Sequence, residues 1–365
     1  MRDFDRNPWC LLGLPFDVID MQGTIAFLQQ SALNKSRCFI STPNLNFLIT
    51  SQSDPDFRRW VINSGLSIAD GMPLIWVARL LDIPLPGRVT GSGVIEMLRK
   101  HDTNVNRILK VYFFGGEAGI AEQACKVINS EQGGLSCAGF YFPGFGSIDD
   151  MSSPTIIETI NESNADFIIV SLGAKKGQAW IEQNRDKLSA PIISHLGAVV
   201  NFVAGNIQRA PVWMQQTGLE WVWRILQEPT LWRRYFTDGA KFLSLIVGRV
   251  LPYAFWKFRN KTMFSTSQPV TCDVDLVDDV IEITLHGECI NQSLEPLKPI
   301  FRNELEKYKS IRLNLGDVPV VDGAFLGLCM MLRKHLNKNG YALQFVGLNR
   351  DVRRIIHWNC VDYLL

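Results

Sequence analysis

Hydroxyl, amide and carboxylate side chains recur where strand-like runs of the sequence end, and these groups could bind a polar substrate. Thr42 and Asn44 directly follow Arg37–Ser41, a run that predicts a buried strand passing into a helix. The acidic turn at Asp70 opens a second helical stretch. In open α/β sheets, ligands bind at the edge where strands pass into helices. An Asp before Gly also serves as a turn residue or helix N-cap, so Asp70 has two interpretations at this point.

Three motifs follow one another along the chain: Thr42-Pro43-Asn44, Ala69-Asp70-Gly71 and Pro84-Leu85-Pro86-Gly87-Arg88-Val89-Thr90-Gly91. Their order and spacing resemble the WecG/TagA/CpsF family of glycosyltransferases, and the resemblance continues through about residue 236. It implies that Asp70 is the general base and that Thr42 and Asn44 orient the acceptor or the donor by hydrogen bonds. It also implies that Arg88 offsets the charge that builds on leaving UDP. Without the family, Arg88 would be assigned to a surface ion pair.

The resemblance implies an inverting, UDP-sugar-dependent transferase. It would move an N-acetylhexosamine, most often N-acetylmannosamine, to a polyprenyl-diphosphate-linked sugar in exopolysaccharide or cell-surface glycan biosynthesis. Inversion requires one base to take the acceptor hydroxyl proton in line with the departing UDP, so one carboxylate suffices. Two rivals stay open. One is a degenerate transferase that acts as a membrane-bound regulatory scaffold; the other is a hydrolase or epimerase of nucleotide sugars, for which no second carboxylate of suitable context stands out beside Asp70.

Glycines follow three further strand-like runs, at Gly115 and Gly116, at Gly173 and at Gly197. Small residues at these strand ends let a ligand approach the backbone. The Gly115-Gly116 turn has neither the spacing of a dinucleotide fingerprint nor a Walker lysine, which excludes NAD and P-loop sites. Such a turn at a helix N-terminus can accept a nucleotide diphosphate. A glycine pair that packs a helix fits the sequence equally well.

The corner of the nucleotide-sugar pocket departs from the family pattern G-x-P-x-Q-E-x-W-I. Ungapped alignment on Trp180-Ile181 replaces the glutamine with Gly177 and the glutamate with Gln178. Gln178 substitutes for the glutamine after a shift of one residue, or belongs to a solvated turn. Asn201 replaces the aspartate of the family's G-x-x-F-D-F-x-x-G region. His195, just before that region, is either a donor to the diphosphate or a satisfied structural residue.

Many glycosyltransferases bind a divalent metal with an Asp-x-Asp motif, which Asp54-Pro55-Asp56 matches. The match lies at the start of a predicted helix rather than at a strand end. These acidic residues are therefore better interpreted as an N-terminal cap. We predict no metal and no cofactor.

Residues 206–261 are basic and aromatic, with nine lysines and arginines against three acidic residues and with five interleaved tryptophans. By resemblance, four arginines of this appendage bind the lipid diphosphate: Arg209, Arg224, Arg233 and Arg234. Leu231 occupies a position that is often arginine. Such a composition predicts a peripheral segment in a membrane interface, on the cytoplasmic face of the inner (cell) membrane, although a core helix with a solvated face shares it. No uncharged apolar stretch of about 18 residues predicts a spanning helix.

A linker rich in Ser, Thr and Gln is predicted at 262–270, and residues 271–365 then alternate strands and helices. Strands are predicted at 280–285, 311–315 and 342–346, and helices at 294–308, 325–336 and 351–358. This order resembles a STAS domain, whose signature D-S-S-G-L-G is Asp322-Gly323-Ala324-Phe325-Leu326-Gly327 here. Both hydroxyls are missing, so we expect a protein-docking role rather than a phosphorylation switch.

Residues 1–205 alternate strand-like and helix-like segments, as a parallel sheet with crossover helices requires. The predicted class is α/β: a Rossmann-like, mainly parallel sheet with helices on both faces, a helical C-terminal appendage, and a second small STAS-like α/β domain. A formal net charge of +1 argues against a nucleic-acid partner. The eight cysteines lack a CxxC pair and are all expected to be reduced thiols of a cytosolic protein. No signal peptide is predicted, and a homo-oligomer stays open.

Overall fold

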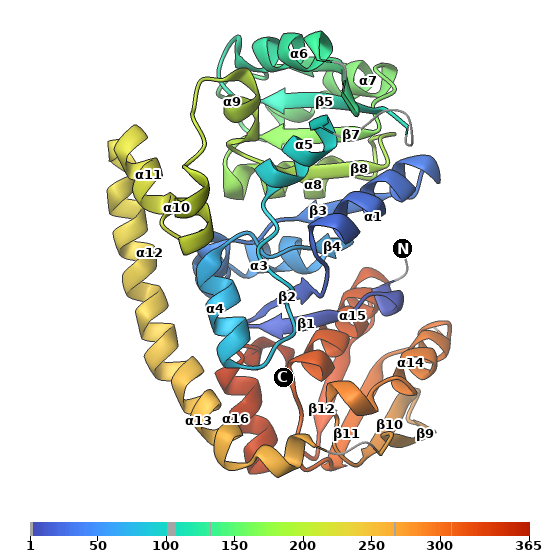
Figure 1. The fold of residues 1–365 in the computed structure, drawn as a ribbon. Coiled ribbons are helices and arrows are strands. Elements are labelled where there is room, and N and C mark those ends of the chain that lie inside the picture. Colours follow the sequence, from blue (N-terminus) through green and yellow to red (C-terminus); the bar gives the residue numbers. More distant parts are fainter. Residues whose placement is uncertain (1–2, 101–106, 132, 266–267, 308) are drawn as a thin grey trace.

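The computed structural model describes residues 3–100, 107–131, 133–265, 268–307 and 309–365. Figure 1 shows an α/β region around a six-stranded sheet, a long helical segment along one side, and a smaller sheet with its own helices. A short hairpin of β1 (Pro8–Leu11) and β2 (Leu14–Asp17) lies between the two sheets. The predicted α/β class with a mainly parallel sheet is confirmed.

The six strands of the large sheet are all parallel and run in the order β4-β3-β8-β7-β5-β6. Strands buried on both faces read as nearly continuous apolar runs, which is why the sequence located β3 so closely. The strands are β3 (Cys38–Ser41), β4 (Leu66–Ser67), β5 (Leu109–Gly115), β6 (Leu135–Tyr141), β7 (Phe167–Ser171) and β8 (Ile192–His195).

Helices cover both faces of this sheet, as predicted. One face packs against α1 (Met21–Leu33), α5 (Gly91–Lys100), α6 (Ile120–Ser130) and α9 (Val199–Ala204). The other face packs against α7 (Pro154–Glu162) and α8 (Ala174–Asn184). Three further helices follow β3 and β4 and belong to a core that continues into the C-terminal part: α2 (Leu45–Ser53), α3 (Pro55–Ile62) and α4 (Met72–Leu80).

The strand order reverses at two places. From β3 the chain continues to β4 on one side, whereas β8 pairs on its other side; β5 likewise lies between β6 and β7. Ligands of open α/β sheets bind beyond the carboxyl ends of the strands at such switch points. We call them the β3/β8 and β5/β7 switch points. The turns that carry the candidate residues of the sheet therefore meet at one edge.

The appendage consists of α10 (Val212–Thr217), α11 (Glu220–Gln227), α12 (Trp232–Leu245) and α13 (Leu251–Arg259). A π-helical turn, Ile246–Val250, joins α12 to α13, so that the two form one long helix beside α4 and α16 (Figure 1). Asn46 of α2 donates to Asp238 of α12, and Lys257 of α13 contacts Asp82 at the end of α4. Within the described ranges, no helix is both long and apolar enough to cross a membrane.

The second sheet has the order β12-β11-β10-β9 and contains one strand that the sequence did not predict. β10 (Val280–His286), β11 (Ile311–Asp317) and β12 (Leu343–Val346) are the predicted strands and are parallel. β9 (Thr271–Val277) adds an antiparallel edge strand, nearly all of it exposed, which explains its weak apolar signal. The predicted helices are α14 (Leu297–Leu305), α15 (Gly323–Lys338) and α16 (Arg350–Trp358); residue 308 and the linker positions 266–267 lie outside the described residues.

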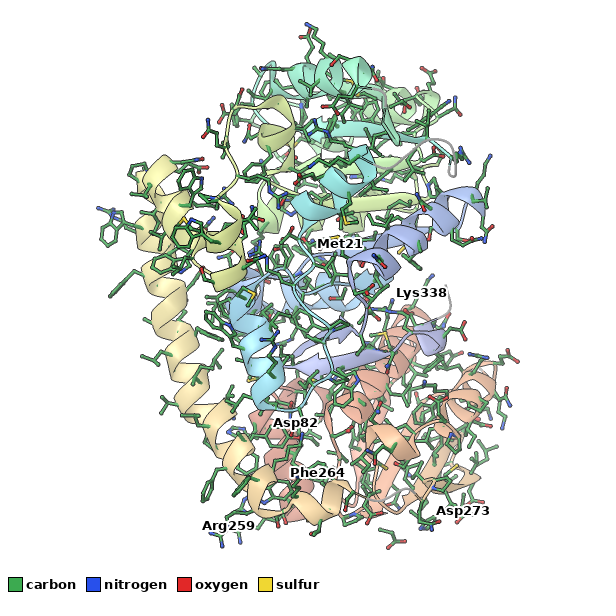
Figure 2. All side chains as sticks on the ribbon, viewed as in Figure 1. Met21, Asp82, Arg259, Phe264, Asp273 and Lys338 are labelled. Atoms are coloured by element: carbon green, nitrogen blue, oxygen red, sulfur yellow. A yellow bond between two sulfur atoms is a disulfide. The ribbon has the colours of Figure 1, made fainter. Side chains whose placement is uncertain are left out.

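The C-terminal part packs directly onto the N-terminal hairpin. Figure 2 shows side chains filling the space between the hairpin and α15, with Lys338 at the far end of that helix. A Cβ on Gly327 would lie 2.1 Å from the carbonyl oxygen of Pro8, and one on Gly323 would lie 2.9 Å from that of Cys10. These two glycines of the predicted STAS-like signature therefore allow the backbones of α15 and β1 to approach each other. The segment expected to dock a partner is buried inside the chain.

Two of the eight cysteines contradict the expectation of reduced thiols. Cys125 on α6 and Cys137 on β6 form a disulfide, because the helix folds back beside its following strand and brings their Cα atoms to 5.2 Å. This disulfide was not predicted from the sequence, because the 12-residue separation of the two cysteines matches no short cysteine motif. The other six cysteines are free thiols, as expected.

Replacing Gly327 by alanine tests the contact between α15 and β1. We expect Gly327→Ala to lower the free energy of unfolding by about 1–3 kcal/mol, because the methyl group overlaps backbone that cannot give way. Gly239→Ala on α12 is the matched control, since its Cβ meets nothing within 4 Å and alanine favours a helix. Urea unfolding followed by circular dichroism measures both. Equal midpoints for the two variants would contradict the assigned packing.

Candidate active site

Asp70 lies at the β3/β8 switch point because backbone hydrogen bonds tie the turns after β3 and β4 together. The Asp70 amide donates to the Pro43 carbonyl oxygen over 2.9 Å, and Val89 donates to the Ala69 carbonyl over 2.9 Å. The amide of Gly91, the first residue of α5, donates to the Asp70 carboxylate over 3.4 Å. The three motifs singled out in the sequence, which extend from Thr42 to Gly91, thus converge on one carboxylate.

The Asp70 carboxylate is partly enclosed, with 27% of its side chain exposed. Burial raises its pKa to about 6; Glu220 also raises it, whereas Arg88 and the Gly91 amide lower it. The Arg88 Nε lies 3.9 Å from the carboxylate. A carboxylate with this pKa is largely ionised at neutral pH and is a stronger proton acceptor than an ordinary aspartate.

Asn44 and Thr42 lie beside Asp70, and they differ in whether the side chain has a polar atom left for a ligand. The Asn44 side-chain oxygen caps α2 by accepting from the Phe47 amide over 3.1 Å, so its amide nitrogen is the group left for a ligand. Thr42 is buried.

Asp54 caps α3, as Asn44 caps α2, and also pairs with Lys175 at 2.7 Å, which confirms the helix-cap interpretation of the Asp-x-Asp match. The described residues contain no group of three or more His, Cys, Asp or Glu that could hold a metal ion.

Arg88 is bound from the appendage rather than by a surface partner. Its Nη2 donates to the Glu220 carboxylate of α11, and its Nη1 donates to the Gln215 carbonyl oxygen of α10. No second carboxylate stood out beside Asp70 in the sequence, but folding of the appendage brings Glu220, 150 residues further along the chain, to the Arg88 that also faces Asp70. The only signal for Glu220 in the sequence was its place in the basic and aromatic stretch 206–261.

The glycines at the β5/β7 switch point adopt conformations that suit an open backbone. Gly115, Gly116 and Gly173 have φ angles of 98°, 86° and 80°. The Gly116 amide donates to the Ser171 carbonyl oxygen over 2.7 Å, which ties the ends of β5 and β7 together. The glycine pair therefore lies in a tight turn at the end of β5, and a Cβ on Gly116 would lie 3.3 Å from the Val200 side chain of α9, so the turn also packs against a helix.

Among the α-helices that come next after the six strands of the large sheet, α2 and α7 have side-chain caps and the other four lack them. Within the described residues, α4, α6, α8 and α9 have none, whereas side chains cap α1, α2, α3 and α7. The uncapped helices α6 and α8 begin after Gly119 and Gly173. Their first N–H groups and positive dipole ends are therefore available to an anion.

His195 and Gly177 explain one departure from the family pattern. His195 is buried at the end of β8, and a Cβ on Gly177 would lie 2.2 Å from its Cδ2 atom. A glutamine at position 177 would therefore occupy the space of the imidazole. Burial lowers the pKa of His195 to about 4, so the ring is neutral at physiological pH.

Gln178 is fully buried on α8, which excludes the solvated-turn interpretation. Neither polar atom of its amide has a hydrogen-bond partner, and the same holds for His195 Nε2 and Ser171 Oγ in the described part of the chain. Buried polar groups are nearly always satisfied, so an unsatisfied set near the ends of β7 and β8 indicates polar atoms that a ligand or water would complete. A Cβ on Gly197 would lie 3.3 Å from the His195 ring, and Asn201 lies half-buried on α9.

The four appendage arginines have different partners within the described residues. Arg209 pairs with Glu96 of α5 and donates to Gln215. Burial lowers the pKa of Arg209 and Arg88 lowers it further, whereas Glu220 and Asp70 raise it. The other three belong to the outer helices: Arg224 pairs with Glu228, and Arg233 and Arg234 lie over the neighbouring rings of Trp232 and Tyr235.

A cavity of about 380 Å³ lies between α5 and α9 beside Arg209. Ser92 and Glu96 line it from α5, and Val199 and Phe202 line it from α9. Ser92, which lines the cavity, directly follows Gly91, whose amide donates to the Asp70 carboxylate. The cavity offers room next to Arg209 for a ligand group of moderate size, but neither Asp70 nor Arg88 lines it.

The fit between Gly177 and His195 can be tested by a double-mutant cycle. We expect Gly177→Ala to cost about 1–3 kcal/mol of unfolding free energy, because the methyl group overlaps the imidazole. Gly197→Ala should cost less, since its Cβ lies 3.3 Å from the ring. His195→Ala should recover much of the Gly177→Ala loss in the double variant. Strictly additive losses in urea unfolding would contradict the contact.

Comparisons with known proteins show to which family this chain belongs. Residues 9–254 match the model of the "Glycosyl transferase WecG/TagA/CpsF family", which leaves the second sheet outside the match. An N-acetylglucosaminyldiphosphoundecaprenol N-acetyl-beta-D-mannosaminyltransferase of Bacillus subtilis is 25% identical over 235 residues, which is 64% of this chain and 89% of that protein. The protein of that name from Staphylococcus aureus is 24% identical, over 61% of this chain and 85% of its own length. The chain therefore belongs to the WecG/TagA/CpsF family and is a glycosyltransferase.

Proposed function

We propose that this chain transfers an N-acetylhexosamine, with N-acetylmannosamine as the first candidate, from a UDP sugar to a polyprenyl-diphosphate-linked sugar. The observation that supports the proposal is the position of Asp70: its carboxylate lies beside Arg88 at the β3/β8 switch point and has a raised pKa. The names of the two relatives supply the sugar and the type of acceptor. The product would enter exopolysaccharide or cell-surface glycan biosynthesis.

In the proposed mechanism, Asp70 takes the proton of the acceptor hydroxyl. At the same time, the oxygen of that hydroxyl attacks the anomeric carbon of the donor sugar in line with the departing UDP. A single displacement inverts the anomeric configuration and requires no second catalytic carboxylate. The amide nitrogen of Asn44 and the hydroxyl of Thr42 would orient the reacting sugars. Arg88 would offset the negative charge that accumulates on UDP.

The donor diphosphate would lie at the β5/β7 switch point. A Cβ on Gly173 would meet nothing within 4 Å and Gly116 is only half-buried, so a ligand could approach the backbone there, and the N-termini of α6 and α8 supply N–H groups for an anion. Gln178 and His195, with their unsatisfied polar atoms, would bind the nucleotide sugar together with Gly197 and Asn201. The lipid diphosphate of the acceptor would bind Arg209, Arg224, Arg233 and Arg234.

The appendage is proposed to lie in the membrane interface on the cytoplasmic face. Along α12 and α13, exposed apolar side chains recur at helical spacing over about 40 Å. Basic residues flank them, including Lys241 and Arg259. A helix with one buried face, one exposed apolar stripe and flanking cations fits a lipid surface better than water. The stripe comprises Trp232, Phe236, Leu243, Val247, Leu251, Phe255 and Phe258.

The proposed organisation is a transferase core at 1–205, a membrane-associating appendage at 206–261, a linker at 262–270 and a STAS-like domain at 271–365. The scaffold alternative requires the last of these to recruit a protein partner. Burial of the Asp322–Gly327 segment against β1 speaks against recruitment through that segment. The transferase proposal is therefore favoured over the scaffold.

Asp70→Asn tests the proposed base. We expect transfer to fall by about 10²–10⁴-fold with unchanged folding, because asparagine keeps the shape and cannot accept the proton. The assay follows radiolabelled sugar from a panel of UDP sugars to a short-chain polyprenyl-diphosphate N-acetylglucosamine, with and without chelator. The wild-type kcat/KM should fall below about pH 6, since protonation of Asp70 removes the base. An active Asp70→Asn variant, or activity that requires manganese, would contradict the mechanism.

Phe255→Asp tests membrane binding by the stripe. We expect at least a tenfold loss of partitioning onto vesicles of anionic phospholipid, because the change removes apolar area and adds a charge that anionic lipid repels. Leu276→Asp on β9 is the matched control, since Leu276 and Phe255 are each 63% exposed but Leu276 lies on the second sheet. Flotation with vesicles measures both. Equal losses for the two variants would contradict a specific membrane face.

A further inference from the structure

Arg88 lies between two carboxylates that come from different parts of the chain. Asp70 follows β4 in the sheet, and Glu220 opens α11 in the appendage. The Arg88 Nη2 donates to Glu220, whereas its Nε stays 3.9 Å from Asp70. The guanidinium therefore makes its direct hydrogen bond to Glu220 and only a longer ion pair to Asp70.

Glu220 reaches Arg88 only because the α10–α11 segment is docked on α4 and α5. Gly218, between the two helices, fits closely over Met72 and Trp76 of α4, and Arg209 pairs with Glu96 of α5. No residue of α11 is fully buried. The Arg88–Glu220 pair is thus a principal attachment of α11 to the core.

The charged groups that influence Asp70 come from every side of the site. Arg88 and Arg209 are cationic, the Gly91 amide donates to the carboxylate, and Glu220 is the remaining anion. Removing Glu220 would leave two cations and a helix N-terminus facing Asp70 with no opposing charge. The carboxylate would then be held more firmly in its ionised form and would be a weaker base.

We propose that Glu220 is a positioning residue that couples docking of the α10–α11 segment to activation of Asp70: by binding Arg88, it withdraws the guanidinium from the base. The inference rests on the proposed function, because it assigns Asp70 as the base. It adds a reason why the appendage matters for chemistry besides lipid binding. Undocked, the enzyme would hold Asp70 in an ion pair with Arg88; docked, it would free the carboxylate for the acceptor hydroxyl.

The test is a direct titration of the Asp70 carboxyl in the full-length protein by carbon-13 NMR of labelled aspartate. The Asp70 signal is assigned by its loss in Asp70→Asn. Glu220→Gln keeps the size of the side chain and removes its charge, and should lower the Asp70 pKa by about 1 unit. Glu228→Gln on the same segment is the control, because Glu228 pairs with Arg224 and not with Arg88. It should leave the Asp70 titration unchanged.

An unchanged Asp70 titration in Glu220→Gln, or an equal shift in Glu228→Gln, would overturn the inference. This readout needs no substrate, so it stands apart from the proposed function, whose failure would appear as absent sugar transfer by the wild type. Where transfer is measured, Glu220→Gln should lower kcat more than it changes KM. It should also move the acidic limb of the pH profile to lower pH, which a merely structural role would not do. A Glu220→Gln profile that coincides with wild type would likewise overturn the inference.

Discussion

One buried guanidinium connects the parts of this structure. Arg6 is fully buried, donates to the carboxylates of Asp3 and Asp17, and donates to the Ser64 carbonyl oxygen. Asp17 in turn accepts from the Ser67 amide of β4, three residues before Asp70. A buried charge stripped of its partner typically costs about 3–5 kcal/mol, so this arrangement allows little displacement of the hairpin. The position of the candidate base therefore depends on the N-terminal hairpin.

The hydrogen-bonded group around Arg6, which includes Asp3 and the Ser64 carbonyl, extends into the C-terminal part. Lys334 of α15 donates to Asp3 and to the Ser64 carbonyl, so the second sheet's longest helix is fixed to the turn before β4. The glycine face of α15 packs on β1 alongside it. The C-terminal part is thus packed into the chain and is not a freely suspended module. Its buried residues share one apolar core with α2, α3 and α4, the helices that follow the turns of the site.

The site combines residues fixed by packing with backbone left open. Side chains cap α2 and α7, which follow strands of the large sheet, whereas α6 and α8 begin at glycines without a side-chain cap. The unsatisfied amide of Gln178 and the unpartnered His195 Nε2 are additional features of the same edge. Uncompensated donors and acceptors are costly in a protein interior and persist where function uses them. Gly177 adds to this arrangement, since its missing side chain admits the histidine.

Apolar runs and turn residues are local signals, and from them the sequence predicted five of the six strands of the large sheet and most of the helices; the two-residue strand β4 gave no such signal. Ordered motifs, through their resemblance to a family, predicted that Thr42, Asn44, Asp70 and Arg88 share one site. Only the tertiary structure decided the contact of Glu220 with Arg88, the Cys125–Cys137 disulfide and the burial of Gly327 against Pro8. Each of these joins segments whose own sequences carry no mark of the partner. Charge pairing, disulfide geometry and backbone approach depend on distances in space, and packing of the whole chain sets those distances.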